Sequence, residues 1–208
     1  LLIDTHALIH RFFHALPPLT APNGEPVNAV YGIANMALKM FNPPAGGQRP
    51  DYIAACFDRP EKTFRSEAFQ DYKIHRPAAV PALITQFKLT RELLDKFKIK
   101  IVEMAGFEAD DLIGSLAAKF QDEADLKIII VSGDLDLLQL VRGEKVVVQF
   151  LRKGLSDTFI YDAVKNHANT ESLKKFVLLV TIPAILILLW LKDSSMRIIV
   201  SLLALFIL

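Results

Sequence analysis

The stretch "KIIIVSGD" (residues 127–134) places four consecutive large apolar residues ahead of a serine, a glycine and an aspartate. An uninterrupted apolar run of this length indicates a strand that is covered on both faces, as strands of parallel sheets are. The other runs of the same character are "LLID" (1–4), "DYIAACFD" (51–58), "IKIVEM" (99–104) and "KVVVQF" (145–150). We therefore predict a sheet of buried strands.

Segments with helical spacing separate these predicted strands. Apolar residues recur every three to four positions over residues 28–41, 81–97 and 108–120, which is the period of an amphipathic helix. Strands that alternate with helices favour a parallel sheet between helical layers. The predicted fold class is α/β, with a central, mainly parallel sheet flanked by helices.

Every predicted strand before residue 140 ends in, or just before, a carboxylate. The acids concerned are Asp4, Asp58, Glu108, Asp110, Asp111, Asp134 and Asp136. Acids at the start of a helix are favoured by the helix dipole, but this does not explain acids that close apolar strands. The carboxyl ends of parallel strands meet at one edge, where like charges repel unless cations neutralise them. Oxygen ligands favour Mg²⁺ or Mn²⁺, and such ions suit phosphodiester hydrolysis.

Charge is unevenly distributed along the chain, although the formal net charge is only +1. Residues 59–100 contain ten Lys and Arg against five Asp and Glu, whereas residues 101–136 contain nine acids against two bases. A basic segment beside an acidic one suits a protein that grips a polyanion while it holds metal ions. Segregated charge is equally common on solvated helices, so both interpretations stay open.

The chain begins at Leu1, inside the first predicted strand, so its N-terminus looks clipped. The first residues do not have the pattern of a signal peptide, because no basic head precedes a long apolar stretch. The single cysteine, Cys56, excludes a disulfide within the chain and is interpreted as a small core residue. We expect a cytoplasmic location.

The composition changes abruptly towards the C-terminus. Two apolar runs, residues 176–191 and 198–208, follow the predicted α/β pattern, and Pro183 interrupts the first. We place a domain boundary near residue 168, which separates a domain of residues 1–168 from an apolar helical tail of residues 169–208. Three interpretations of the tail stay open: a short membrane anchor, a buried hairpin, or foreign sequence produced by a slip of reading frame.

Five segments carry a resemblance to a known family: "LLIDTHALIHRFFHAL", "GEPVNAVYGI", "CFDRPEKTFRSEAFQDYKIHR", "GFEADDLIGSLA" and "VSGDLDLLQLV". Together they resemble the 5′-nuclease (5′-3′ exonuclease) domain at the N-terminus of bacterial DNA polymerase I. That family belongs to the flap endonuclease superfamily, whose fold is similar to that of PIN-domain nucleases. The resemblance runs from Leu1 to about Asp162. It implies a PIN-like three-layer fold and a domain that cuts DNA at 5′ ends or flaps in replication and repair.

The resemblance also implies roles for individual residues. The seven acids match the family's metal ligands, for Mg²⁺ or Mn²⁺ and for two ions in the intact family. Residues 59–76 match the start of a helical arch through which a free 5′ end passes. Phosphate contacts are implied for Arg11, Arg65, Lys73 and Arg76, with Arg65 and Lys73 next to the scissile bond, and Tyr72 could stack on a base. The implied partners are DNA with 5′ ends or flaps and a polymerase domain in the intact gene product.

Each of these assignments has a plainer alternative. The basic residues could merely solubilise a surface segment, and Tyr72 could simply pack. His6, His10 and His14, spaced by four, share one face of a helix, but no further Cys or His cluster supports a zinc site, so we assign them no ligand role. Cys56 is not expected to be a nucleophile, because no histidine partner is apparent.

The sequence departs from the family after "TFIYDAVKNH" (158–167). The family continues there with a G-D-x-S-D-N-I-P-G stretch and a helix–hairpin–helix element, which supply two acids to the second metal and bind the duplex. Asp193 in "LKDSSM" is a poor match. Two rivals to a DNA nuclease therefore stay open: an inactive DNA-binding remnant, held at a membrane by its tail, and a PIN-type ribonuclease.

Overall fold

A computed structural model describes residues 1–43, 47–68, 79–153 and 157–161 of the chain. Its strands form one sheet in the order β3-β2-β1-β4-β5-β6. The strands are β1 (Leu2–Asp4), β2 (Ala54–Cys56), β3 (Lys100–Val102), β4 (Ile128–Ser132), β5 (Val146–Lys153) and β6 (Asp157–Tyr161). All neighbouring pairs are parallel except β5 and β6, which are antiparallel. The predicted mainly parallel α/β sheet is confirmed. The strand β6 was not predicted from the sequence.

The first strand of the chain lies in the middle of the sheet. Ile3 is in register with Ala55 of β2 on one side and with Val131 of β4 on the other. A parallel neighbour has to be reached by a crossover, and helices supply these crossovers. The carboxyl ends of β1, β2 and β4 are thereby brought to one edge.

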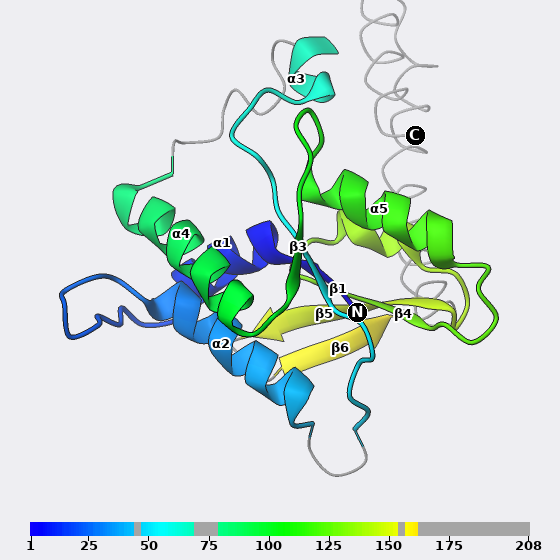
Figure 1. The fold of residues 1–208 in the computed structure, drawn as a ribbon, viewed down its shortest axis with the longest axis horizontal. Coiled ribbons are helices and arrows are strands. Elements are labelled where there is room, and N and C mark those ends of the chain that lie inside the picture. Colours follow the sequence, from blue (N-terminus) through cyan, green and yellow to red (C-terminus); the bar gives the residue numbers. More distant parts are fainter. Residues whose placement is uncertain (44–46, 69–78, 154–156, 162–208) are drawn as a thin grey trace, which may run out of the picture. The chain divides into compact units, whose positions relative to one another are not determined.

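Helices cover both faces of the sheet (Figure 1). The helical elements are α1 (Thr5–Ala15), α2 (Asn28–Phe41), α3 (Phe64–Ala68), α4 (Pro81–Lys96), α5 (Ala109–Phe120) and the 3₁₀ turn η1 (Asp136–Leu140). α1, α2 and α4 pack together on one side, whereas α5 contacts β1, β2 and η1 on the other (Figure 1). The three predicted helices are thus observed to within a residue of their expected ends.

Alternate residues of each strand supply two separate cores, because successive side chains of a strand point to opposite faces. Ile3 and Val131 pack with α1, α2 and α4. Cys56, Ile130 and Val148 pack with α5 and η1. This double coverage is the reason why the strands are apolar at every position rather than at every second one.

The chain divides into two compact units, Leu1–Ala163 and Val164–Leu208. The predicted domain boundary near residue 168 and the apolar tail lie outside the described residues, so both stay predictions. Among the residues that the structure does describe, no helix combines the length and the apolar character needed to cross a membrane.

Candidate metal and nucleic-acid site

A cavity of about 640 Å³ opens at the carboxyl edge of the sheet. Five of the seven predicted acids line it. They are Asp4, Asp58, Glu108, Asp110 and Asp134. These five come from four separate parts of the chain, so the predicted convergence of carboxylates at this edge is observed for them. Asp111 and Asp136 lie beside the cavity without lining it.

Asp4 is the most deeply buried of these carboxylates, with only 5% of its surface exposed. It ends β1 and caps α1, where its Oδ1 accepts a hydrogen bond of 3.2 Å from the Ala7 N–H. Its Oδ2 accepts one of 2.6 Å from the Ser132 hydroxyl. The pKa of Asp4 is raised to about 6, mainly by burial and to a lesser degree by the nearby charges of Asp58 and Asp134, against the opposing effect of these hydrogen bonds. Ionisation of Asp4 therefore costs more free energy in this cavity than it does in water.

Asp58 joins the strand edge to the start of α5. It lies two residues beyond β2, and its Oδ1 accepts a 2.7 Å hydrogen bond from the Ala109 N–H, the first of the helix. Such unpaired amides at a helix start favour a carboxylate partner. The other oxygen, Oδ2, lies 3.7 Å from His6 Nε2. Asp58 therefore lies just beyond the end of β2 and also contacts the amide end of α5.

The three acids at the start of α5 have different environments. Glu108 is 6% exposed and caps the helix, and its N–H donates to Asp111 Oδ2 at 3.0 Å, which closes a capping box. Asp110 is exposed, and its pKa is raised by partial burial and by the neighbouring charge of Asp111. Acids at this helix start therefore serve two purposes. Asp111 stabilises the start of the helix, whereas Glu108 and Asp110 line the cavity.

Arg65, which was predicted to contact phosphate, is bound to these acids. Its two guanidinium nitrogens donate to both oxygens of Asp111 at 2.6 Å each. Its Nη1 also lies 3.5 Å from Glu108 and 3.9 Å from Asp110. A bidentate Arg–carboxylate pair of this kind is a strong, oriented interaction. A phosphate contact by Arg65 consequently requires donors other than the two that Asp111 accepts.

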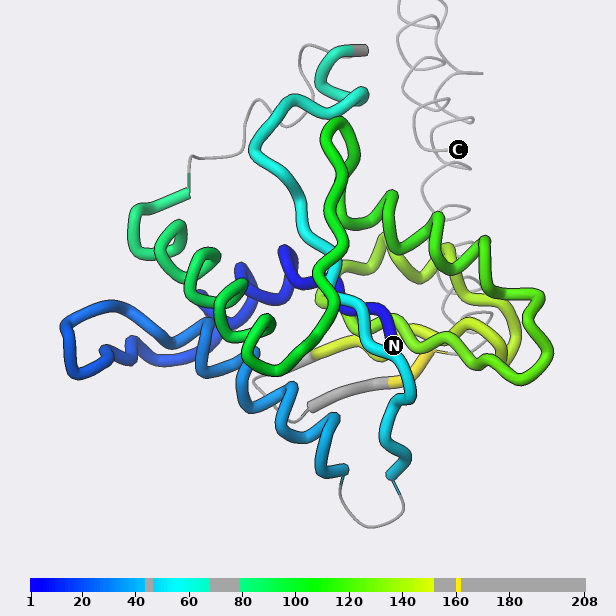
Figure 2. Tube along the Cα trace, viewed as in Figure 1, coloured from blue at the N-terminus to red at the C-terminus, as the bar shows by residue number. Residues whose placement is uncertain are grey.

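The short helix α3 carries Arg65 to this position. The segment that leads into α3 runs beside the loop between β3 and α5 (Figure 2), where the Phe64 N–H donates to the Gly106 carbonyl at 3.0 Å. The rings of Phe64 and Phe107 lie 5.7 Å apart. Segments far apart in the sequence are thus joined next to the acids. Tyr72, Lys73 and Arg76 lie outside the described residues, and their predicted DNA contacts stay predictions.

The loop after β4 brings the fourth part of the chain to the cavity. Asp134 Oδ1 accepts a 3.0 Å hydrogen bond from the Asp136 N–H, so the two acids form one tight turn at the start of η1. Arg11, a predicted phosphate contact, lies against this turn: a Cβ added at Gly133 would stand 2.9 Å from the Arg11 Cδ. Arg11 also stacks over Phe150 at 5.5 Å.

A row of histidines forms another wall of the cavity. His6, His10 and His14 of α1 all line it, together with residues at the start of α4. The rings of His6 and His10 lie 4.5 and 5.6 Å from the ring of Phe87 on α4. Sequence reasoning placed the three on one helix face but assigned them no role. The spacing shows that they share a face, whereas only the packing of α1 shows where that face points.

The side chains around the cavity fit a divalent cation in their chemistry. Carboxylate oxygens are the ligands that hard divalent ions prefer, and a cation would offset the burial and, to a lesser degree, the repulsion that raise the pKa of Asp4. Within the described part of the chain, no three His, Cys, Asp or Glu side chains stand close enough to hold one ion in the present arrangement. The donors therefore suit a hard divalent ion in their chemistry.

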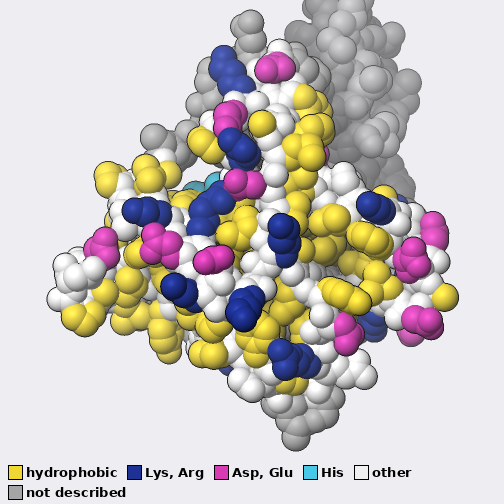
Figure 3. Space-filling view, viewed as in Figure 1, with side chains coloured by type: hydrophobic (Ala, Val, Ile, Leu, Met, Phe, Trp, Pro, Cys, Tyr) yellow, Lys and Arg dark blue, Asp and Glu magenta, His cyan; other side chains and the backbone are white. Residues whose placement is uncertain are grey.

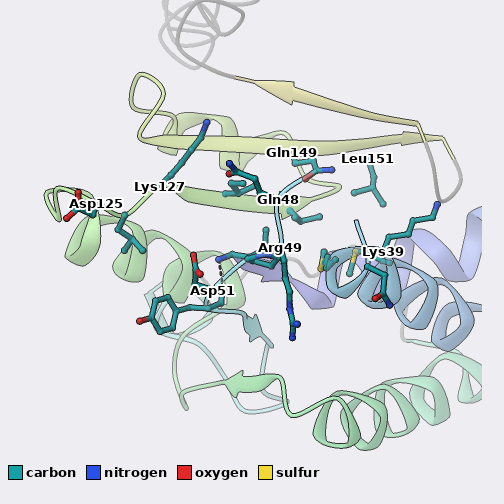
Figure 4. A pocket seen from close by; sticks show the side chains of 17 residues that line it. Lys39, Gln48, Arg49, Asp51, Asp125, Lys127, Gln149 and Leu151 are labelled. Carbon is teal, nitrogen blue, oxygen red and sulfur yellow. Dashed lines mark hydrogen bonds between the residues drawn. The ribbon is translucent and has the colours of Figure 1, made fainter. Parts of the chain in front are cut away.

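A second hollow, of about 780 Å³, is lined by residues of α2, β4 and β5 and by the segments that precede β2 and β4. Its labelled charged residues are of both signs and come from α2 and from the segments that precede β2 and β4 (Figure 4). They are Lys39, Arg49, Asp51, Asp125 and Lys127, and all are exposed. On the face seen in Figure 3, basic and acidic side chains are likewise interspersed with hydrophobic ones. None of the predicted site residues that the structure describes lines this hollow.

Cys56 is buried in the centre of the sheet, as predicted for a core residue. Burial, and to a lesser degree the charge of Asp4, raises the pKa of its thiol to about 12. The reactive form of a cysteine is the thiolate. The thiol is therefore not a nucleophile at neutral pH.

Comparison with known proteins places the chain in a family. The family described as 5′-3′ exonuclease, N-terminal resolvase-like domain, matches residues 1–171. The 5′-3′ exonuclease of Aquifex aeolicus is 39% identical over 147 residues, which are 71% of this chain and 49% of the relative. DNA polymerase I of Geobacillus stearothermophilus is 40% identical over 160 residues, which are 77% of this chain and 18% of the relative. The chain thus spans half or less of these two relatives.

Solved structures share the fold at low sequence identity. The T5 D15 protein, co-crystallised with metal ions, has a TM-score of 0.53 and 20% identity, covering 77% of this chain and 56% of that chain. The T5 5′-exonuclease with bound zinc ions has a TM-score of 0.52 and 18% identity, with the same coverage. These likenesses concern the fold, whereas the family match spans most of the sequence. The chain belongs to the 5′-3′ exonuclease family, as its N-terminal resolvase-like domain.

Proposed function

We propose that this chain is the metal-dependent nuclease domain of a 5′-3′ exonuclease or flap endonuclease, acting on DNA with 5′ ends or flaps in the cytoplasm. The observation that carries the proposal is the cavity at the carboxyl edge, which five carboxylates from four parts of the chain line together. Membership of the 5′-3′ exonuclease family supports it. So do the names of the relatives, 5′-3′ exonuclease and DNA polymerase I. A polymerase domain in the intact gene product is part of the proposal.

The carboxylates that line the cavity are the proposed metal ligands. Asp4, Asp58, Glu108, Asp110 and Asp134 would hold Mg²⁺ or Mn²⁺. Such an ion supplies activation of the attacking water and stabilisation of charge on the leaving oxygen. Asp4 is already oriented by two hydrogen bonds, so little freedom is lost when a ligand binds it.

The remaining charged residues act around these ligands. Arg65 neutralises Asp111 and part of the charge on Glu108, which lowers the repulsion among the remaining acids. The predicted roles of Arg65 and Lys73 in steadying the scissile phosphate belong to this proposal. No side chain is needed as a general base, because coordination to an ion can lower the pKa of water to about 7.

The test is a cleavage assay of the full chain on a 5′-flap DNA substrate with Mg²⁺, alongside the variant Asp134→Asn. We expect the variant to lose most of the activity, because Asp134 contributes a carboxylate to the cavity. Full activity in the variant would contradict the role of Asp134. Equal cutting of matched RNA and DNA flaps would favour a PIN-type ribonuclease.

The departure of the sequence from the family pattern after residue 167 favours one second candidate, a chain that binds DNA without cutting it. Binding of the flap without any cleavage, at every Mg²⁺ and Mn²⁺ concentration, would support this candidate against the nuclease.

A further inference from the structure

Ser132 is a buried residue that the proposed mechanism does not yet use. It is the last residue of β4 and is 0% exposed. β1 and β4 run parallel with Ile3 opposite Val131, so the next step along both strands brings Asp4 beside Ser132. The two side chains thus meet at the point where the two central strands end.

The Ser132 hydroxyl makes two hydrogen bonds with different partners. It donates to Asp4 Oδ2 at 2.6 Å and accepts from the Asp134 N–H at 2.9 Å. A hydroxyl has one proton to donate, and a backbone N–H can only donate. The proton of Ser132 is therefore directed at Asp4, while its lone pair holds the loop of Asp134. One side chain thus binds the Asp4 carboxylate and the backbone of Asp134.

These two bonds are the centre of a longer chain of contacts. The Oδ1 atom of Asp4 accepts a hydrogen bond from the Ala7 N–H. The Oδ1 atom of Asp134 accepts one from the Asp136 N–H. Asp4 and Asp134 both line the cavity, whereas Ser132 does not. Ser132 therefore contacts the Asp4 carboxylate and the Asp134 backbone without lining the cavity itself.

We propose that Ser132 is a positioning residue, which sets the spacing between the Asp4 and Asp134 carboxylates so that both hold the same divalent ion. The inference rests on the proposed function. Hydrogen-bond partners behind metal ligands fix the orientation of those ligands, and their loss typically weakens metal affinity by about 10- to 100-fold. Because Asp4 ends β1 and Asp134 follows β4, a group that binds both the Asp4 carboxylate and the Asp134 backbone N–H limits the distance between the two acids.

A plainer role for Ser132 would be to satisfy buried polar groups, as most buried hydroxyls do. That role affects the stability of the fold but not the metal affinity of a folded variant. Three substitutions separate the roles: Ser132→Ala removes the hydroxyl, Ser132→Thr keeps it, and Ser132→Cys keeps the size with a weak donor. Thr90→Val is the matched control, because Thr90 is an equally buried hydroxyl on α4 with no hydrogen-bond partner among the described residues.

The experiment measures Mn²⁺ binding to the full chain by electron paramagnetic resonance, and amide hydrogen exchange without metal. We expect Ser132→Ala to bind Mn²⁺ about tenfold more weakly and to exchange the Asp134 amide about tenfold faster. Ser132→Thr and Thr90→Val should stay near the wild type, and Ser132→Cys should fall in between. If Ser132→Ala does not fold, the Cys and Thr variants carry the test.

Wild-type Mn²⁺ affinity in Ser132→Ala, or in Ser132→Cys where Ala does not fold, would overturn the inference. So would an equal loss in Ser132→Thr, because that result would point to packing instead of the hydroxyl. In both cases the wild-type chain still binds Mn²⁺, and the proposed function stands. A wild-type chain that neither binds Mn²⁺ nor cuts flap DNA would overturn the proposed function and this inference with it.

Discussion

The two hollows of the domain differ in what holds their charged groups. At the carboxyl edge, Asp4 is buried and is tied to another strand by Ser132, and Asp58 is tied to α5 through Ala109. In the larger hollow, charged residues such as Lys127 and Asp125 are exposed to solvent. Buried charge costs free energy unless something compensates it, whereas exposed charge costs little. A candidate site is therefore marked by charge kept in an unfavourable place, and not by the size of the hollow.

The largest expected effect is on catalysis, and it compares one carboxylate from each hollow. Asp58→Asn should lower the rate of flap cleavage by on the order of 10³-fold, because a ligand and the contact to Ala109 are both altered. Asp125→Asn, in the other hollow, should stay within about twofold of the wild type. The measurement is a single-turnover cleavage rate at saturating Mg²⁺. Similar losses in the two variants would remove the functional difference between the hollows.

The next effect is on stability, and it tests whether charge in the acid cavity is costly. Asp4 has a pKa of about 6 in the folded chain, against roughly 3.9 when unfolded. Between these values the folded chain binds more protons, so the free energy of unfolding falls as pH rises from about 4 to 6. At pH 7 the ionised carboxyl costs about 3 kcal/mol, at 1.36 kcal/mol per pKa unit.

The variant Asp4→Asn removes this charge and keeps a good helix cap. Without metal, it should therefore be more stable than the wild type at pH 7, by about 3 kcal/mol, and similar to it at pH 4. Urea denaturation at both pH values measures this, and Asp51→Asn, an exposed acid of the other hollow, serves as the control. A gain that does not depend on pH would show that the charge of Asp4 is already compensated.

The smallest effect compares two arginine pairs. Arg65 is bonded to Asp111, whose side chain is 16% exposed, whereas Arg91 pairs with Glu103, whose side chain is 31% exposed. Arg65→Met should lower the free energy of unfolding by about 2 kcal/mol, because it leaves partly buried carboxylates unpaired. Arg91→Met should cost about 1 kcal/mol or less. Thermal denaturation of the two variants measures both losses of stability. Equal losses would show that the Arg65–Asp111 pair contributes no more than an ordinary surface ion pair.

Most of the sheet could be predicted from the sequence because its strands are buried on both faces. Val131 and Ile130 point into different cores, so the run around them is continuously apolar and easy to recognise. β6 was missed because "DTFIY" mixes polar and apolar residues and lies at the edge, paired with β5 alone. Edge strands lack the burial that makes a strand visible in a sequence.

The site was predictable as a set of acids but not as an arrangement. The rule that ligands gather at strand carboxyl ends placed Asp4 and Asp134 at one edge, where the structure has them. The same rule could not show that Arg65 would bind Asp111, since that contact depends on how α3 packs against the loop between β3 and α5. Nor could it show that His10 faces the cavity. Sequence separation hides such contacts until tertiary packing is known.

The central place of β1 has a consequence for synthesis on the ribosome. Residues 2–4 are made before both of their partner strands, and one of these is complete only when residue 132 has been made. Long-range pairing of this kind delays folding, because the entropy of closing a long loop has to be overcome first. β1 therefore emerges on the nascent chain without its partner strands, and chaperones have most to protect before β4 leaves the exit tunnel.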